Sequence, residues 1–322
     1  MTSRFARWDG AELPDQSGRH VVVTGANSGL GYETARTLAT LGARVTLACR
    51  DVGRANEAVD KLVGSSSVPR DSLTVVELDL ASLDSVRRAA EAIRADQPHL
   101  DLLINNAGVM TIPFGRSADG YERTFAINHL GHFALTGLLL ESLLATPGSR
   151  VLTVSSNAHR RARSSDLERV ESGTGYSPAA AYDRSKLANL LFAYALQHEL
   201  SAADAKTISL AAHPGNARTD LWRTSSRLER ALLAPRLGLL TSRLVQSAED
   251  GALPILRAAL DPSARGGDYY GPAGWQGNTG RPVRVKSSTD SYDRSAQRAL
   301  WQQSEQLTRV TYPLSGEAGA PG

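Results

Sequence analysis

Residues 20–41 read HVVVTGANSGLGYETARTLATL, and their pattern indicates the class of fold. Its first five residues are an apolar run typical of a buried strand, and Leu30, Leu38 and Leu41 recur at helical spacing. The glycines between follow G-x-x-x-G-x-G rather than the commoner G-x-G-x-x-G. Glycines permit a tight turn and close backbone approach, and the following helix N-terminus favours an anion. The loop alone could be a turn without a ligand; its flanking strand and helix favour a phosphate-binding turn.

Apolar runs and helical patterns alternate along the rest of the chain. Further strands are predicted at residues 44–49, 73–78, 100–105, 150–155, 207–212 and 268–270, and helices at 30–41, 53–62, 82–95, 119–145, 180–200 and 247–260. Such alternation predicts β-α-β units and a parallel sheet. We therefore expect a single α/β domain, a doubly wound Rossmann fold with a parallel sheet of about seven strands and helices on both faces. Ligands bind such a sheet beyond the carboxyl ends of its strands, where the strand order switches.

Composition limits the class of protein. The chain has 322 residues, of which 41% are hydrophobic and 21% charged, as in ordinary globular proteins. A net charge of +3 does not suggest a nucleic-acid partner. One cysteine, Cys49, excludes an intrachain disulfide and a cysteine-cluster metal site, and no metal is expected. No apolar run approaches the ~18 residues of a spanning helix, so we expect a cytoplasmic protein without a membrane partner.

Three segments are distinguished by their composition. Residues 1–17 are a polar extension without the features of a signal peptide, and residues 18–312 form the predicted domain. Residues 313–322 are rich in small residues, and we expect them to be disordered.

The end of the second strand bears on the choice of cofactor. A site for NAD usually places an acidic residue about 20 residues beyond the glycines, whereas an arginine accommodates the 2′-phosphate of NADP. Arg50 occupies this place, and Asp51 follows it. The sequence thus predicts NADP(H), while Asp51 keeps NAD(H) open and Arg50 could be merely a solvated arginine.

Polar residues that can carry chemistry follow the later strands. Tyr182 and Lys186 are four residues apart, so they share one face of a predicted helix. A tyrosine has an ordinary pKa near 10, and a neighbouring ammonium lowers it. Ser156 stands at the end of the fifth strand, where its hydroxyl can bond a substrate carbonyl. Asn128 lies in the long helix after the fourth strand, and it is either a structural hydrogen-bonder or the holder of a relay water.

Together these motifs resemble the short-chain dehydrogenase/reductase family over about residues 18–300. The matching positions are residues 24–31, Asp79, residues 105–108, Asn128, Ser156, Tyr182, Lys186 and residues 213–215. The strings ACRD (48–51), NHLGHF (128–133) and SKLAN (185–189) resemble its retinol-dehydrogenase-like and protochlorophyllide-reductase-like branch.

The resemblance implies roles for individual residues. Tyr182 would be the general acid in reduction and the general base in oxidation, and Ser156, preferred over Ser155, would polarise the carbonyl. Lys186 would bind the nicotinamide ribose and lower the pKa of Tyr182, and Asn128 would hold the relay water. The residues implied to bind the cofactor are Gly25, Asn27, Ser28, Gly29, Leu30, Gly31, Arg50, Asp79, Leu80, Asn106, Ala107, Gly108, Tyr182, Lys186, Pro214, Gly215 and Thr219.

The family also implies a small substrate lid, at about residues 218–246. Its many leucines favour a lipophilic substrate, although they could equally belong to surface helices that pack on the core. Residues 159–178 form an insert whose arginines either attract an acidic substrate or are simply solvated. The role of this insert, and of the glycine-rich residues 269–282, is left unassigned.

We therefore expect an NADP-dependent alcohol dehydrogenase or carbonyl reductase that acts on a small-molecule carbonyl or alcohol. An NADPH-dependent C=C reductase and a non-catalytic NADPH sensor are the alternatives. Family members also suggest a homodimer or homotetramer through the long helices after strands four and five.

Overall fold

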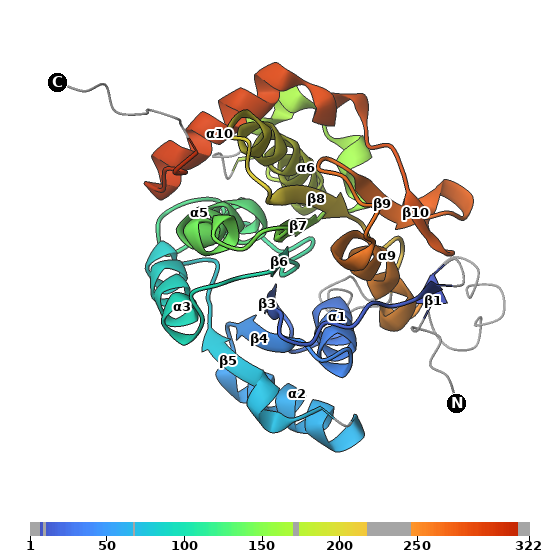
Figure 1. Cartoon of the computed structure of the whole chain (residues 1–322). Coiled ribbons are helices and arrows are strands. Elements are labelled where there is room, and N and C mark those ends of the chain that lie inside the picture. Colours follow the sequence, from blue (N-terminus) through green and yellow to red (C-terminus); the bar gives the residue numbers. More distant parts are fainter. Residues whose placement is uncertain (1–6, 9–10, 67, 170–173, 218–245, 315–322) are drawn as a thin grey trace.

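The computed structural model describes residues 7–8, 11–66, 68–169, 174–217 and 246–314 of the chain. Its centre is a sheet of eight strands in the order β10-β9-β8-β7-β6-β3-β4-β5 (Figure 1). The strands are β3 (His20–Thr24), β4 (Arg44–Cys49), β5 (Leu73–Glu77), β6 (Leu102–Asn105), β7 (Arg150–Val154), β8 (Ile208–Ala212), β9 (Tyr269–Pro272) and β10 (Pro282–Arg284). All neighbours pair in parallel except β10, which is antiparallel to β9. The predicted Rossmann fold is confirmed, with β10 as an additional edge strand.

Helices cover both faces of this sheet. The helices are α1 (Gly29–Thr40), α2 (Val52–Ser65), α3 (Leu83–Asp96), α4 (Arg123–Phe125), α5 (Gly131–Leu144), α6 (Pro178–Ala202), α9 (Ala248–Leu260) and α10 (Arg294–Thr308). Short turns of helix are η1 (Arg70–Ser72), η2 (Ala126–Leu130), η3 (Asn157–Arg161), η4 (Ser164–Arg169), η7 (Trp275–Gly277) and η8 (Thr289–Tyr292). Helices α1, α2 and α9 pack on one face, and α3, α5 and α6 pack on the other.

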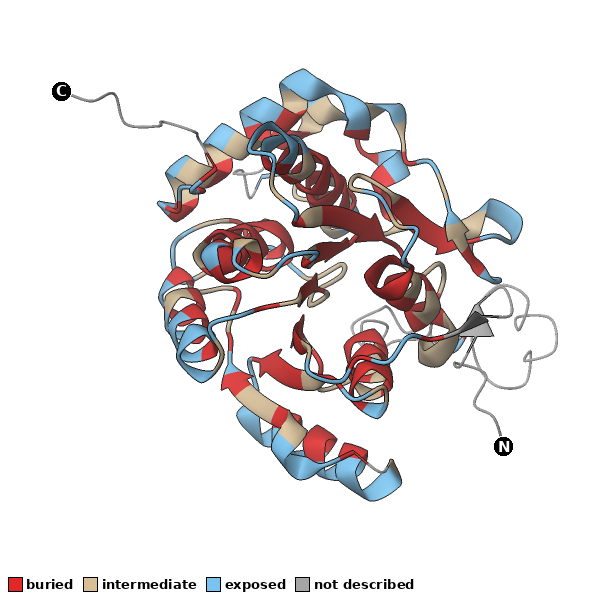
Figure 2. Cartoon of the chain, in the orientation of Figure 1, coloured by how far each residue is buried: buried red, intermediate tan, exposed pale blue. Residues whose placement is uncertain are grey.

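Strand β3 illustrates why the sheet lies at the core. Val21 and Val23 belong to the apolar cluster under α1 and α9, whereas Val22 belongs to the cluster under α3 and α5. All three side chains are fully buried, and the surrounding strands are buried along most of their length (Figure 2). A parallel strand covered on both faces requires a continuous apolar run, which is the pattern that residues 20–24 show.

The long helix after β6 starts later than predicted and is not uniform. The sequence predicted a helix over residues 119–145, but the helical region begins at Arg123. Glu122 caps it, because its carboxylate accepts hydrogen bonds from the backbone N–H groups of Thr124 and Phe125. Between α4 and α5, η2 is a turn of π-helix that contains Asn128. Single π-helical turns are frequent at functional sites.

Helix α10 was not predicted, and it covers α5 and α6. Trp301 and Tyr312 pack against Phe133 of α5, with ring centroids 5.2 and 4.9 Å apart. The Tyr312 hydroxyl also donates to the Phe133 carbonyl at 2.7 Å. An assembly through this part of α5 and α6 would therefore require α10 to move. The homodimer or homotetramer stays a prediction.

Both ends of the chain carry structure at residues described here. In the predicted N-terminal extension, β1 (Arg7–Trp8) pairs with β2 (Ala11–Glu12) in a small antiparallel ladder. At the other end Leu314 is buried in the α3–α5 cluster, so the ordered chain reaches beyond residue 312, where the tail was predicted to begin. The rest of that tail, residues 315–322, lies outside the described residues, as do residues 218–245 of the predicted lid.

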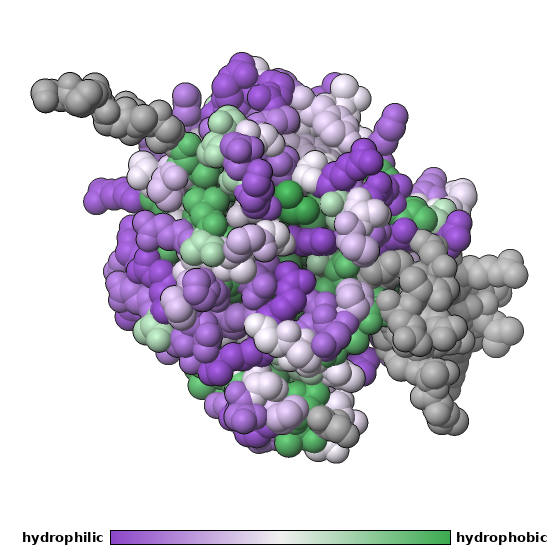
Figure 3. Space-filling model, viewed as in Figure 1, coloured by the Kyte–Doolittle hydropathy of each residue, from purple (hydrophilic) through white to green (hydrophobic). Residues whose placement is uncertain are grey.

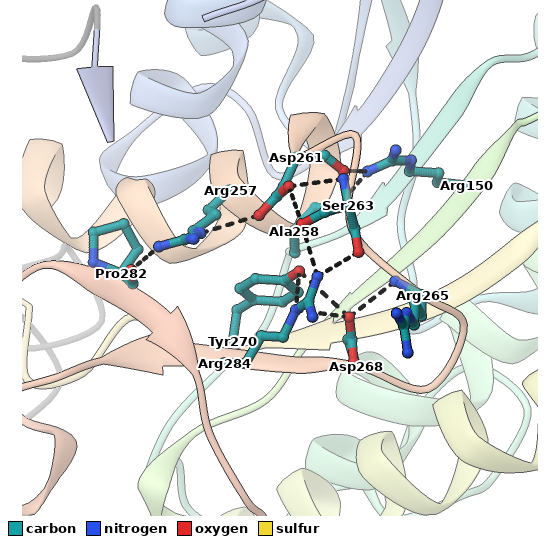
Figure 4. Close-up of polar contacts among 10 residues, drawn as sticks. All are labelled: Arg150, Arg257, Ala258, Asp261, Ser263, Arg265, Asp268, Tyr270, Pro282 and Arg284. Atoms are coloured by element: carbon teal, nitrogen blue, oxygen red, sulfur yellow. Dashed lines mark hydrogen bonds and ion pairs between the residues drawn. The ribbon is translucent and has the colours of Figure 1, made fainter. Parts of the chain in front are cut away.

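Charged residues fasten the β9–β10 edge of the sheet to the end of α9 (Figure 4). Arg284 of β10 donates to the Tyr270 hydroxyl at 3.0 Å and pairs with Asp268 at 3.0 Å. Arg257 in the last turn of α9 pairs with Asp261 at 3.2 Å and donates to the Pro282 carbonyl at 2.6 Å. These contacts hold the antiparallel edge strand in place.

The face of the molecule in Figure 3 is mainly hydrophilic. On the face in Figure 3, apolar residues show only in small patches between polar ones. Within the described part of the chain, none of the helices combines the length and the apolar character needed to cross a membrane.

Candidate active site

A cleft lies where the strand order switches, between the loops that follow β3 and β6. It consists of two adjoining hollows of about 390 and 230 Å³, and we call them together the switch-point cleft. Most of the predicted cofactor residues line it. These are Gly25, Asn27, Ser28, Gly29, Leu30, Gly31, Arg50, Asp79, Leu80, Asn106, Ala107 and Gly108.

The glycine loop and the loop after β6 are in direct contact. A Cβ on Gly31 would lie 2.3 Å from the Gly25 carbonyl oxygen, so no other residue fits there without moving the backbone. The Thr24 hydroxyl accepts hydrogen bonds from the backbone N–H groups of Asn106 and Ala107, each at 2.9 Å. The Asn106 side chain in turn donates to the Thr24 carbonyl at 2.8 Å. The cleft floor is therefore a preformed cradle of backbone, which fits a pyrophosphate at the N-terminus of α1.

One end of the cleft is basic. Arg50 lies at the end of β4, and Arg54 follows in the first turn of α2; both line the two hollows. The Asp51 carboxylate caps α2 by accepting from the Arg54 backbone N–H at 3.0 Å. Two guanidinium groups thus lie at the same end of the cleft.

Tyr182 and Ser156 meet at the carboxyl ends of the strands. Tyr182 lies in the first turns of α6, whose N-terminus is capped by Ser177. Burial raises the pKa of Tyr182, and a side-chain hydrogen bond with Ser156 opposes this rise. Ser155 is fully engaged elsewhere, because its buried hydroxyl donates to the Lys186 carbonyl at 2.8 Å. Of the two serines, Ser156 is the one that faces Tyr182.

Lys186 lies beneath Tyr182 and beside the cleft. Its Nζ is 5.7 Å from the centroid of the Tyr182 ring and donates to the Val154 carbonyl at 3.2 Å. It also lies 3.6 Å from where a Cβ on Gly108 would be, and Gly108 lines the cleft. Burial lowers the pKa of Lys186 to about 8.

Asn128 anchors the loop after β6. Its Oδ1 accepts from the Val109 N–H at 2.8 Å, and its Nδ2 donates to the Val109 carbonyl and to the Ser185 hydroxyl, each at 2.9 Å. Both amide protons are thereby used, so any water at this residue has to bond an oxygen. The His132 ring meets the Asn128 carbonyl at 3.2 Å and the Thr24 hydroxyl at 2.9 Å.

The end of β8 packs near the start of α1 and α9, and its residues Pro214 and Gly215 line neither hollow of the cleft. Pro214 and Gly215 follow this strand, and a Cβ on Gly251 of α9 would lie 2.8 Å from Leu30 and 3.5 Å from the Pro214 carbonyl. Gly215 has a φ of +66°, and its neighbour Asn216 donates to the Asn278 carbonyl at 2.7 Å. The glycine-rich loop thus packs on the end of β8. Thr219 lies outside the described residues.

The histidines in this region hold hydrogen bonds rather than a common ligand. His129 bonds the Ser304 hydroxyl at 2.9 Å, and burial lowers its pKa to about 3. Among the residues with described positions, no group of three or more histidine, cysteine or acidic side chains could hold a metal ion.

Comparison with known proteins identifies the family. The sequence pattern described as short chain dehydrogenase matches residues 19–229. The chain belongs to the short-chain dehydrogenase/reductase family. It is therefore an oxidoreductase of a family that binds nicotinamide cofactors.

The relatives of this short-chain dehydrogenase/reductase place it in the retinol-dehydrogenase-like branch, as predicted. Retinol dehydrogenase 14 of Mus musculus is 38% identical over 304 residues, covering 91% of this chain and 86% of that protein. Polyprenol dehydrogenase of Homo sapiens is 35% identical over 306 residues, covering 92% and 87%. A crystal structure of an uncharacterized protein from Mycobacterium paratuberculosis is 40% identical, with a TM-score of 0.77 and coverage of 95% and 99%.

Sequence reasoning missed several residues around this dehydrogenase/reductase site. Met110 and Ile112 line the cleft, and the apolar string after residues 105–108 was an available signal for them. Arg54 lies in the first turn of α2, four residues after Arg50, and its closeness to Arg50 in the sequence was an available signal. His159 bonds the Ser156 carbonyl three residues before it, and its other ring nitrogen bonds the distant Ser288, which nothing in its local sequence indicates.

Proposed function

We propose that this protein interconverts a carbonyl and an alcohol on a lipophilic small molecule, using NADP(H), with Tyr182 as general acid in reduction and general base in oxidation. The observation that carries the proposal is the meeting of Ser156, Tyr182 and Lys186 beside the switch-point cleft. Relatives named for retinol and polyprenol, both lipophilic alcohols, support this substrate class.

The chain's own residues supply binding and proton transfer. In reduction the Ser156 hydroxyl donates a hydrogen bond to the carbonyl oxygen, and the Tyr182 hydroxyl transfers its proton to that oxygen. The buried Lys186 ammonium, 5.7 Å from the tyrosine ring, stabilises the phenolate that remains. NADP(H), when bound, supplies or accepts the hydride. In oxidation Tyr182 takes the hydroxyl proton back.

The residues of the cleft fit this cofactor. The glycine loop at the N-terminus of α1 lines the larger hollow and suits the pyrophosphate, and Asp79 and Leu80 line the smaller hollow. Two arginines, Arg50 and Arg54, face the same hollow, and guanidinium groups bind phosphate through paired hydrogen bonds. Asp51, which would favour NAD, is engaged as the cap of α2. These observations support NADP(H) over NAD(H).

Removing the two arginines is expected to erase the preference for NADPH. Arg50→Ala and Arg54→Ala should each weaken NADPH binding about 10- to 100-fold, the value of a lost charge-assisted hydrogen bond. NADH, which lacks the 2′-phosphate, should bind all variants alike. The measurement is a titration followed by nicotinamide fluorescence, with Arg298→Ala on exposed α10 as the matched control. Equal affinity of the wild type for NADH and NADPH would contradict the cofactor proposal.

The catalytic proposal is tested with all-trans-retinal as the probe. Incubation with NADPH should yield retinol, which chromatography separates from retinal. The proposal would be contradicted if the protein binds NADPH but reduces neither retinal nor any of a series of simpler long-chain aldehydes.

A further inference from the structure

We propose that His159 is a positioning residue that holds the main chain of Ser156 and so sets where the serine hydroxyl meets Tyr182. The proposal rests on the function proposed above. It concerns a residue of the insert that the reaction does not touch.

The two ring nitrogens of His159 have partners that determine its tautomer. The Ser288 backbone N–H, which can only donate, points at Nε2 over 3.1 Å. The Ser156 carbonyl, which can only accept, lies 2.6 Å from Nδ1. The ring must therefore be neutral, with its proton on Nδ1. Because one donor and one acceptor fix both nitrogens, the ring has a single orientation that satisfies them.

Hydrogen bonds hold both the main-chain carbonyl and the side-chain hydroxyl of Ser156. Its carbonyl accepts from His159 Nδ1 and from the His159 backbone N–H at 3.1 Å. Its hydroxyl oxygen accepts from the Ala158 N–H at 3.2 Å, which leaves the hydroxyl proton for another acceptor. The proton is thus not used by η3, and it is available to the Tyr182 hydroxyl or to a substrate oxygen. Loss of the His159 side-chain bond leaves the carbonyl with the His159 backbone N–H alone.

The far side of the ring is tied to the helix that carries Tyr182. Ser287, next to Ser288, bonds the buried Tyr194 hydroxyl of α6 at 2.8 Å. Tyr194 is three turns along α6 from Tyr182, about 18 Å at helical rise. A series of contacts thus connects Ser156, through His159 and residues 287–288, to α6. It connects the two residues that must act together on one oxygen atom.

Neighbouring contacts hold the insert against the same segment. The Arg160 side chain donates to the Lys286 carbonyl at 2.5 Å, and the Ser164 N–H donates to Asp290 at 3.0 Å. The ring of His159 is fully buried and meets Tyr269 edge-on, with centroids 5.8 Å apart. Burial lowers the pKa of His159 to about 4, and Arg160 adds to this fall. The ring therefore stays neutral near pH 7, and its bond to the Ser156 carbonyl does not change with pH in that range.

Two substitutions separate the halves of this contact. In His159→Asn the amide nitrogen takes the place of Nδ1 and can still donate to the Ser156 carbonyl. In His159→Gln the amide oxygen takes the place of Nε2 and can still accept from Ser288, but the donor to Ser156 is lost. His20→Gln is the matched control, because His20 is also buried with both ring nitrogens bonded but begins β3, at the opposite end of the sheet from the cleft.

Steady-state reduction of all-trans-retinal by NADPH is the first readout. His159→Gln should lower kcat about 10- to 100-fold, the cost of misplacing a reacting group, with an unchanged Kd for NADPH. His159→Asn should keep kcat within about threefold of the wild type, and His20→Gln should keep the wild-type kcat. In a Ser156→Ala background, His159→Gln should add no further loss, because the group it positions is gone. Equal losses in the Asn and Gln variants, or an additive loss in the Ser156→Ala background, would overturn the proposal.

The second readout does not depend on activity. In long-range 1H–15N spectra of histidine-labelled protein, the signal that disappears in His159→Gln should be that of an Nδ1–H tautomer, while His20 and His132, whose Nδ1 atoms also face carbonyl oxygens, should keep their signals. An Nε2–H tautomer would overturn the proposal. If the wild type binds NADPH and shows the Nδ1–H signal but reduces no carbonyl, the proposed function fails while the contact to Ser156 stands.

Discussion

Replacing Tyr182 with phenylalanine is expected to lower kcat for carbonyl reduction about 100- to 10,000-fold, the usual contribution of a general acid. The substitution removes one hydroxyl from a buried ring and leaves the switch-point cleft intact. NADPH should therefore bind Tyr182→Phe with the wild-type affinity. Because burial raises the pKa of Tyr182, the free enzyme keeps this proton through neutral pH. Reduction should then fall as the pH rises, first as Lys186 loses its charge near its pKa of about 8 and further as the pH passes the raised pKa of Tyr182.

Tyr121→Phe is the control for this experiment. The Tyr121 hydroxyl donates to the Leu307 carbonyl at 2.8 Å, and the residue lines neither hollow of the cleft. Its loss should leave kcat unchanged. If Tyr182→Phe turns over retinal like the wild type, Tyr182 is not the acid. A non-catalytic NADPH sensor would show the same partner binding in both proteins and no turnover in either.

Replacing Lys186 with methionine is expected to abolish turnover while making the fold more stable. Burial lowers the pKa of this lysine from 10.5 to about 8. Below pH 8, keeping the lysine charged therefore costs the folded state about 3 kcal/mol. Methionine fills a similar volume without a charge. The Val154 carbonyl keeps a partner, because Asn189 also donates to it at 3.1 Å. Tm at pH 7 should rise by about 5 °C.

The Tm difference between Lys186→Met and the wild type should depend on pH. Between about pH 8 and 10.5 the unfolded chain binds the lysine proton more tightly than the folded chain does, so the wild type gains stability as the pH rises. The Tm difference between Lys186→Met and the wild type should therefore shrink toward pH 10. Lys206→Met, at an exposed lysine, should show no such difference at either pH. A Lys186→Met variant that melts below the wild type at pH 7 would contradict the account.

Features that depend on a local sequence pattern could be predicted from the sequence. The apolar run of β3, the glycine loop and α1 follow one another without a gap, so each constrains the next. The parallel sheet follows from the repetition of this unit. The same rule places Arg50, Asn106 and Ser156 at strand ends, and the structure puts all of them at the carboxyl edge of the sheet.

What could not be predicted depends on contacts between distant segments. β10 is only three residues long and has no periodicity of its own, and it exists because β9 offers it an edge. The π-helical turn at Asn128 interrupts a pattern that reads as a continuous helix. His159 meets Ser288 across 129 positions of sequence. Such partners become visible only once the chain is folded.

Hydride transfer from the cofactor to the carbonyl carbon can be detected with deuterium. The protein is incubated with all-trans-retinal and NADPH that carries two deuterium atoms at C4 of the nicotinamide, and the product is analysed by mass spectrometry and NMR. We expect retinol with one deuterium on the carbon that bears the hydroxyl. Deuterium on the carbon chain with the aldehyde intact would instead show a C=C reductase. Bound NADPH that transfers no deuterium would contradict the catalytic role of Ser156, Tyr182 and Lys186.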